Sequence, residues 1–254
     1  MTVNEIIDFY YRTNTVDFDT YETTPEYIKV FSKNLHDSYY NHLVPVGNTD
    51  SIKLLEFFEF KKYDRAPVVC VLPLSDDYSK NDMGLKNIAN DSWLRFTGVV
   101  PPKKETVLDF DLKTVGVEQM DDYVDLFMAG FSGGVYGTLP AEYAVVEKLC
   151  FLEMATNPGK HLIAMAYYKK KPVGVVRAIL ESDKAFIYAF AIPKAYRFSG
   201  VTAKLLGAFI LNELFDRGIK HIFLQTEADT VLEKFYKMNG FERLFLGKYY
   251  TKAE

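Results

Sequence analysis

The stretch PKAYRFSGVTAKLL (residues 193–206) joins an apolar, strand-like run that ends at Ile192 to a helical pattern that begins near Val201. A loop that runs into the start of a helix presents backbone N–H groups beside the positive end of the helix dipole, which suits a diphosphate. Gly200 lets that backbone approach closely because it has no Cβ, and Arg197 can add a charge-assisted hydrogen bond. By itself, a single glycine before a helix indicates only an ordinary strand-to-helix turn.

The segments around this loop follow a definite order. Three apolar runs precede it, and the short polar turns KKK and SDK between them predict an antiparallel meander: HLIAMAYY from His161, PVGVVRAILE from Pro172 and AFIYAFAI from Ala185. Further upstream, the patterns predict a strand at 107–112, a helix, a glycine-rich loop at 130–140 and a second helix at 141–154. Downstream, they predict a helix closed by Gly218, the strand HIFLQTE, the short helix LEKFYKMN and a last strand, FERLFLGKYYT. The predicted order is βααβββαβαβ.

This order, together with YRFSGVTAKLL and FYKMNGF, resembles the GCN5-related N-acetyltransferase (GNAT) superfamily over roughly residues 106–254. The resemblance implies an α/β (α+β) GNAT fold, in which helices flank a mixed, mostly antiparallel sheet, and acetyl-CoA as co-substrate. The family's pyrophosphate motif, (Q/R)-x-x-G-x-(G/A), corresponds here to Arg197, Phe198, Ser199, Gly200, Val201 and Thr202. Thr202 departs from the motif, because glycine or alanine is usual there, and its hydroxyl could itself bond a phosphate oxygen.

A second motif follows in ADTVLEKFYKMNGF, from Ala228. Family members often carry Asn, then Tyr seven residues later, then Gly-Phe, and here Tyr236 matches while Asp229 replaces the asparagine. The resemblance implies that Tyr236 protonates the departing CoA thiolate, a role for which a phenol is a fitting weak acid. A pair of core aromatic residues on a short helix is the alternative interpretation.

In this family the fourth strand splays from the fifth, which leaves backbone groups for the pantetheine arm. The resemblance therefore implies that the amides and carbonyls of Phe190, Ala191 and Ile192 hold acetyl-pantetheine. An N–H group of this strand would polarise the thioester carbonyl.

The implied reaction is direct attack of an amine on acetyl-CoA, which requires a base because an alkyl amine has a pKa near 10. Glu227 at the end of the fifth strand is the first candidate, Tyr188 acting through a water is the second, and Glu181 is the third. Each is more readily explained as a packing or solvated strand-end residue, so the base stays unassigned. The loop GFSGGVYG could close over the acceptor with Tyr136 as a wall, or be a plain connection.

The first hundred residues also alternate between strand-like and helical patterns but contain no R-x-x-G-x-G motif. The prolines and charges of VVPPKKE (residues 99–105) suggest a boundary. We therefore predict an α/β domain at 1–104, which resembles the degenerate N-terminal half of some tandem GNAT proteins, and an N-acetyltransferase domain at 105–254.

Composition restricts the partners. The net charge is −4 and basic residues are scattered, which argues against nucleic acid. The sequence shows no membrane span or signal peptide, and Cys70 and Cys150 each lie in an apolar run as expected for buried free thiols, so we expect a cytoplasmic protein. The four histidines lack ligand spacing, so no metal is expected, and a homodimer is possible.

Two functions are compatible with these motifs. The first is an acetyl-CoA-dependent N-acetyltransferase acting on a primary amine of a small molecule or protein. The second is a non-catalytic acyl-CoA-binding sensor or interaction module, suggested by the departures at Thr202 and Asp229.

Overall fold

A computed structural model describes residues 1–79, 84–102, 109–132, 138–197 and 200–253. The chain forms two compact units. The first unit contains Met1–Arg95 and Gln225–Glu254, and the second unit contains Phe96–Leu224. The division into domains 1–104 and 105–254 that the sequence suggests stays a prediction.

The second unit contains most of the predicted meander and its helices. Its elements are β6 (Phe110–Thr114), η3 (Val117–Gln119), α4 (Met120–Phe131), α5 (Glu142–Thr156), β7 (His161–Tyr168), β8 (Lys171–Glu181), β9 (Lys184–Ala191), η4 (Lys194–Tyr196) and α6 (Val201–Asp216). Strand β10 (His221–Glu227) begins in this unit and ends in the first. The strand order is β10-β9-β8-β7-β6, and only the β9–β10 pair is parallel.

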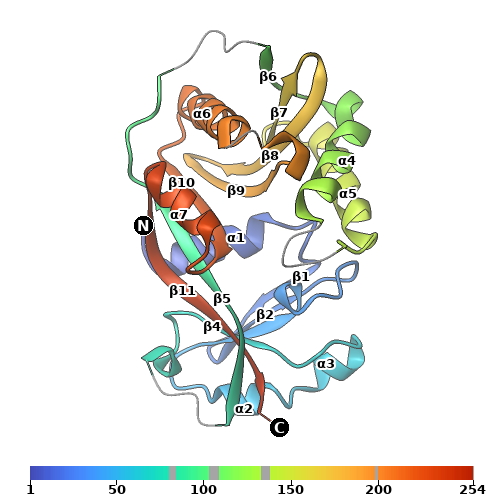
Figure 1. The fold of residues 1–254 in the computed structure, drawn as a ribbon. Helices are drawn as coiled ribbons and strands as arrows, with labels where there is room; N and C mark the ends of the chain where they lie inside the picture. The colour runs from blue at the N-terminus through green and yellow to red at the C-terminus, as the bar shows by residue number, and fades with distance from the viewer. Residues whose placement is uncertain (80–83, 103–108, 133–137, 198–199, 254) are drawn as a thin grey trace. The chain divides into compact units, whose positions relative to one another are not determined.

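The helices of the second unit cover both faces of this sheet (Figure 1). Side chains of α4 and α5 pack in one cluster with Val175 of β8. The neighbouring residue, Gly174, faces α6, because a Cβ placed on it would lie 3.5 Å from Leu206. Adjacent strand residues point to opposite faces, so α4 and α5 lie on one face and α6 on the other.

The first unit combines the N-terminal segment with the end of the chain. Its elements are α1 (Val3–Thr13), β1 (Thr20–Thr23), β2 (Tyr27–Phe31), η1 (Ser38–Tyr40), β3 (His42–Pro45), α2 (Ser51–Leu54), α3 (Phe58–Lys62), β4 (Val69–Val71), η2 (Asp76–Ser79), β5 (Leu85–Phe96), α7 (Val231–Met238) and β11 (Phe241–Lys252). The strand order is β1-β2-β3-β4-β11-β5, and β5 in turn neighbours β10. A strand from the first hundred residues therefore lies between the last two strands of the chain.

The core of the first unit has two sides. Val69 and Val71 of β4 pack with Phe60 of α3 and Tyr250 of β11. Cys70 points to the opposite side, where aromatic side chains gather around Trp93: Tyr10 lies edge-on with ring centroids 5.0 Å apart, and Phe245 is stacked at 5.2 Å. This aromatic packing explains why the N-terminal segment is rich in Tyr and Phe.

The predicted element order from the meander onward is confirmed, with shifted boundaries. Helix α4 continues through Gly130 to Phe131, two residues into the stretch predicted as a loop. The first strand is observed at Phe110–Thr114, and residues 107 and 108 lie outside the described ranges. The glycine-rich composition was a poor guide at Gly130 because this glycine serves close packing rather than a turn.

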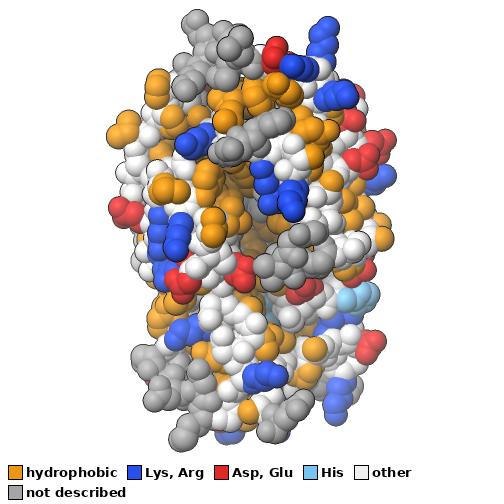
Figure 2. Space-filling view, in the orientation of Figure 1, with side chains coloured by type: hydrophobic (Ala, Val, Ile, Leu, Met, Phe, Trp, Pro, Cys, Tyr) orange, Lys and Arg blue, Asp and Glu red, His pale blue; other side chains and the backbone are white. Residues whose placement is uncertain are grey.

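Three general expectations can be compared with the structure. Cys70 and Cys150 are buried free thiols, as predicted. On the face drawn in Figure 2, Lys and Arg side chains are interspersed with Asp and Glu. Within the described ranges, no helix is long and apolar enough to cross a membrane.

Candidate functional site

The loop before α6 has the geometry of a helix N-terminal anion site. The short helix η4 ends at Tyr196 with Arg197 as its C-cap, and α6 begins at Val201 after Gly200, which is in the left-handed conformation with φ 89°. A side chain at Gly200 would be strained there, although a Cβ would meet no atom within 4 Å. The open space beside Gly200 and the N–H groups of the first helical turn can receive an anion. Phe198 and Ser199 lie outside the described residues.

Thr202 uses its hydroxyl inside the protein. The side chain is fully buried, and Oγ1 donates a hydrogen bond to the carbonyl oxygen of Tyr196 at 2.6 Å. The only hydroxyl proton is therefore engaged, and the bond ties the first turn of α6 to η4. The expectation that this hydroxyl donates to a phosphate does not fit this geometry, whereas the backbone N–H of Thr202 remains suited to that task by its position in the first turn.

Arg197 connects the loop to the end of β9. Its Nε donates to the carbonyl oxygen of Ile192 at 3.2 Å. That carbonyl is one of the groups expected to hold pantetheine, so Arg197 takes up some of its hydrogen-bonding capacity. The remaining guanidinium N–H groups are the ones available to an anion.

Strand β9 separates from β10 where the resemblance predicts it to. The parallel register joins residues 184–187 to residues 221–224 and ends there. On its other edge, β9 pairs with β8 as far as Ala191 opposite Val175. The segment that contains Phe190, Ala191 and Ile192 is therefore held by β8 and lies beyond its pairing with β10.

Two glycines allow helices to approach this segment closely from both faces. A Cβ at Gly130 of α4 would lie 2.8 Å from the Cβ of Ala191 and 2.9 Å from the backbone nitrogen of Ile192. A Cβ at Gly174 of β8 would lie 3.1 Å from Cγ1 of Ile192 and 3.4 Å from Cγ2 of Thr202. Both contacts are tighter than ordinary packing, so the end of β9 has little freedom to move.

A buried charged group supports β9 just before this segment. The register of β8 and β9 shifts between Arg177 and Ala178, which leaves Tyr188 as the extra residue of a bulge. The guanidinium of Arg177 lies 4.4 Å from the centre of the Tyr188 ring and 3.3 Å from Glu147, whose other oxygen accepts from Tyr123 at 2.9 Å. Tyr188, the second candidate base, thus has a packing role over a buried cation.

Glu181, the third candidate base, is not brought to this site. It ends β8 and lies opposite Lys184, the first residue of β9. At the usual rise of a strand, the seven steps along the chain from Lys184 to Ala191 span about 23 Å. Glu181 therefore lies at the opposite end of β9 from the predicted pantetheine segment.

Tyr236 belongs to the first unit, on α7. Its side chain is 8 % exposed, and its ring lies edge-on to Phe241 at 5.8 Å. Burial raises the pKa of this phenol well above its ordinary value, so the hydroxyl keeps its proton at neutral pH. The aromatic contacts agree with the packing interpretation and leave the catalytic role a prediction.

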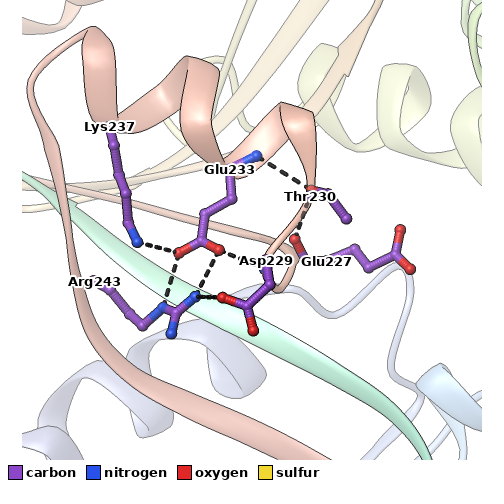
Figure 3. Close-up of polar contacts among 6 residues, drawn as sticks. All are labelled: Glu227, Asp229, Thr230, Glu233, Lys237 and Arg243. Atoms are coloured by element: carbon purple, nitrogen blue, oxygen red, sulfur yellow. Dashed lines mark hydrogen bonds and ion pairs between the residues drawn. The ribbon is translucent and has the colours of Figure 1, made fainter.

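Asp229 belongs to a charged cluster at the start of α7 (Figure 3). Its φ is 61°, a left-handed conformation that Asp and Asn tolerate better than most residues. Its carboxylate accepts from Arg243 of β11 at 2.7 Å, and its backbone N–H donates to Glu233 at 2.6 Å. Asn and Asp can therefore both form this turn, and here the carboxylate binds Arg243.

Glu233 is the centre of that cluster. Its side chain is 2 % exposed, and its two oxygens contact Arg243 at 2.8 and 2.6 Å and Lys237 at 2.8 Å. Burial opposes its ionisation, but hydrogen bonds from Arg243 and Lys237 outweigh that effect and hold the pKa of the carboxyl well below its usual range. We call Asp229, Glu233, Lys237 and Arg243 the α7 clamp, because they fix the helix that carries Tyr236 to β11.

Glu227, the first candidate base, is outside this clamp. Its side chain is exposed, and in Figure 3 it points away from Arg243 and Glu233. Only its backbone takes part in the turn, where the carbonyl oxygen accepts from the Thr230 hydroxyl at 2.9 Å. The carboxylate is therefore available to solvent or substrate.

Gly130, Arg243 and the buried Asp91 lie in no local sequence motif that would mark them as functional. Glu233 and Arg243 are 10 residues apart in different elements, and their ion pair forms only because α7 packs against β11. In the described part of the chain, no group of three or more His, Cys, Asp or Glu could hold a metal ion. His161 instead bonds Glu153 at 2.7 Å, and His42 bonds Tyr11 at 2.9 Å.

Similarity to known proteins points to one family. Residues 121–241 match the model of the acetyltransferase (GNAT) family. No curated protein matches the chain. Three solved structures illustrate the fold: a GCN5-related N-acetyltransferase from Kribbella flavida has a TM-score of 0.66 at 13% identity and covers 100% of this chain and 97% of its own.

A functionally unknown conserved protein from Staphylococcus epidermidis also has a TM-score of 0.66, at 12% identity, covering 99% of this chain and 97% of its own. A GCN5-related N-acetyltransferase from Sphaerobacter thermophilus has a TM-score of 0.62 at 13% identity, covering 98% of this chain and 84% of its own. At such identities these structures show the fold alone. The chain therefore has the GNAT fold, and its residues 121–241 match the acetyltransferase (GNAT) family.

Proposed function

We propose that this protein transfers an acetyl group from acetyl-CoA to a primary amine of a small molecule or protein. The observation that carries the proposal is the end of β9. It leaves its pairing with β10 after Ile187 and runs directly into a loop with a left-handed glycine at the start of α6. An extended acyl-pantetheine can hydrogen-bond to the backbone at the end of β9, and a diphosphate can bind at the start of α6.

The diphosphate end of acetyl-CoA would bind at the start of α6. The backbone N–H groups of Val201 and Thr202 lie in the first helical turn, and the guanidinium of Arg197 adds positive charge. The N–H of Gly200 donates to the carbonyl oxygen of Arg197 at 2.7 Å and thereby closes the turn before the helix. The bond from Thr202 to Tyr196 stabilises this loop before ligand arrives. A preformed site lowers the entropy lost on binding.

The acetyl-pantetheine end would extend along Phe190, Ala191 and Ile192. A backbone N–H here can donate to the thioester oxygen as negative charge develops on it during attack. Because Gly130 and Gly174 pack tightly on both faces, these donors stay in place during the reaction. No charged side chain is required at this point.

Tyr236 would assist the departure of the sulfur. Since burial raises the pKa of its phenol above the usual thiol value of about 8.5, Tyr236 keeps its proton and stabilises the thiolate as a hydrogen-bond donor. Glu227 would accept the proton that the ammonium form of the acceptor must lose before attack. The two buried free thiols are consistent with a reducing compartment such as the cytoplasm.

Thiol release from acetyl-CoA in the presence of a panel of primary amines tests the proposal. We expect turnover with at least one amine, and a 10-fold or greater loss of kcat in Tyr236→Phe with unchanged affinity for CoA. CoA binding without turnover on any amine would instead support the non-catalytic acyl-CoA-binding module. Absence of CoA binding by calorimetry would reject both.

A further inference from the structure

Glu233 and Asp91 are buried carboxyl groups of the first unit that lie in opposite environments. Glu233 is surrounded by donors, and the cations of Arg243 and Lys237 contact both of its oxygens. Asp91 of β5 is 6 % exposed, and among the described residues it has no ion pair. A buried carboxylate without a cation is costly to ionise. Carboxyl groups whose environments separate their proton affinities in this way are candidates for different roles.

Asp91 is hydrogen-bonded by a neutral neighbour. The Nε2 group of Gln225 on β10 donates to Oδ2 of Asp91 at 3.2 Å and also lies 3.5 Å from the hydroxyl oxygen of Tyr249 on β11. Gln225 and Tyr249 bring no charge; their hydrogen bonds favour the ionised carboxylate, but burial of Asp91 outweighs them and raises its pKa.

Gln225 can serve both protonation states of Asp91. Its Oε1 is buried and has no hydrogen-bond partner among the described residues. If Asp91 takes up a proton, the amide can turn and accept the carboxyl O–H with this oxygen, whereas it donates through Nε2 when Asp91 is ionised. Because Gln225 can form a hydrogen bond with either state, Asp91 can take up a proton without leaving a buried polar group unpaired.

Glu227 places a second carboxylate beside this group. It lies two residues after Gln225 on β10, so both side chains project from the same face of the strand. Burial raises the pKa of Asp91 to about 7, and the charge of Glu227 contributes to that increase. Other titratable groups that interact electrostatically with Asp91 belong to α1, to η1 and its preceding loop, to β4 and to β11. They are Tyr11, Asp37, Tyr39, Cys70 and Tyr249.

We propose that Asp91 is a positioning residue for proton transfer, the buried member of a carboxyl pair whose exposed member is Glu227. The inference rests on the proposed function and deepens it. The acceptor ammonium gives one proton to the pair at Glu227, and the pair holds that proton on Asp91. The neutral amine then attacks the thioester, so that the N–C bond forms as the C–S bond breaks. A second proton from the amine converts the departing thiolate to the thiol. The first proton passes to solvent.

The location of Asp91 gives the N-terminal segment a part in the reaction. Strand β5 comes from the first hundred residues, yet it lies between β10 and β11. Near neutral pH, a group that ionises at about pH 7 exists in both forms, which is the condition under which proton transfer is most efficient.

The coupling of the pair can be measured without turnover. Carbon-13 NMR of the side-chain carboxyls of the full chain, recorded from pH 4 to 9, should show one Asp signal with a midpoint near 7 that disappears in Asp91→Asn. In Glu227→Gln the same midpoint should move to lower pH, because the repelling charge is gone. Glu242→Gln, which removes an exposed carboxylate on β11, should leave it unchanged. A midpoint for Asp91 near 4, or one that ignores Glu227→Gln, overturns the proposal.

The consequence for catalysis is read from kcat/KM for the amine against pH. The unmodified protein should show a limb with a midpoint near pH 7, and Asp91→Asn should lose that limb and at least 10-fold in kcat while its affinity for CoA is unchanged. A limb that persists in Asp91→Asn overturns the proposal. If no amine is acetylated, the proposed function fails, whereas the NMR titration still decides whether Asp91 and Glu227 are coupled.

Discussion

The hydroxyl of Thr202 has a structural role in the loop proposed to bind the diphosphate. Its Oγ1 donates to Tyr196, and its methyl group faces Gly174 across the sheet–helix interface. These contacts account for a threonine where the family usually has glycine or alanine, because the larger side chain fills the space beside a glycine.

Thr202→Ala is expected to lower the free energy of unfolding by about 1–2 kcal/mol, through loss of a buried hydrogen bond and of packing. Urea denaturation measures this, and Thr202→Ser, which keeps the hydroxyl, should lose less. CoA affinity of Thr202→Ala, measured by calorimetry, should change by less than threefold. A large loss of affinity with unchanged stability would mean that the hydroxyl contacts the phosphate.

The raised pKa of Asp91 makes the free energy of unfolding depend on pH. Burial raises the pKa of Asp91 to about 7 in the folded chain, whereas an unfolded Asp ionises at about pH 4. Between these values the folded state holds a proton that the unfolded state has lost. The contribution of Asp91 to stability is therefore fully present below about pH 4 and declines as the pH rises through 7.

Asp91→Asn removes this contribution, so the stability of the variant relative to the unmodified protein should increase from pH 4 to pH 7. The increase should exceed ~1.4 kcal/mol, the equivalent of one pKa unit. Denaturant titrations at several pH values provide the measurement, and Glu242→Gln serves as the control. Parallel pH profiles for Asp91→Asn and the unmodified protein would contradict the raised pKa.

At the scale of elements, helix α4 and strand β9 are in contact through a glycine. Gly130→Ala would place its methyl group 2.8 Å from the Cβ of Ala191 and must displace the helix or the strand. The expected loss of stability is about 1–3 kcal/mol, and acetyl-CoA binding should weaken because the displaced segment is the proposed pantetheine strand. Thermal unfolding and calorimetry measure the two effects.

Gly207→Ala is a matched control for this substitution. Gly207 is also a helical glycine, in α6, but its added methyl would lie 3.9 Å from Cε2 of Phe190, an ordinary contact. It should be neutral or raise stability by about 0.5–1 kcal/mol, as expected for Gly→Ala within a helix. If Gly130→Ala behaves like Gly207→Ala, the close approach of α4 to β9 is not important.

At the scale of the whole molecule, the chain order and the strand order disagree. Strand β11 pairs antiparallel with β4, and β5 lies on its other side. Residues 105–254 expressed alone would therefore have β11 without either neighbour. We expect this fragment to unfold without a cooperative thermal transition by circular dichroism.

If the fragment is unstable because it lacks β4 and β5, adding residues 1–104 as a separate chain should restore a cooperative thermal transition. A fragment 105–254 that unfolds cooperatively and binds acetyl-CoA would show that this stretch is an independent domain, as the sequence suggests.

The meander, the helix after it and the loop between them could all be predicted from the sequence. Each of these depends on residues close together in the chain: short polar turns between apolar runs, apolar positions four apart before Gly218, and Gly200 before Val201. Local patterns of this kind follow from backbone geometry and hydrophobic periodicity, so one sequence is enough to predict them. The family resemblance rests on the same local features.

Contacts between residues that are distant in the chain became known only from the folded structure. The insertion of β5 beside β10, the contact of Arg243 with Glu233 and the pairing of Asp91 with Gln225 join residues that are 10 to 134 positions apart. A sequence pattern records which face of an element is buried but not which element covers it. Burial changes the chemistry as well. A carboxyl group surrounded by cations and a carboxyl group buried without them cannot be distinguished in the sequence, but their affinities for a proton differ.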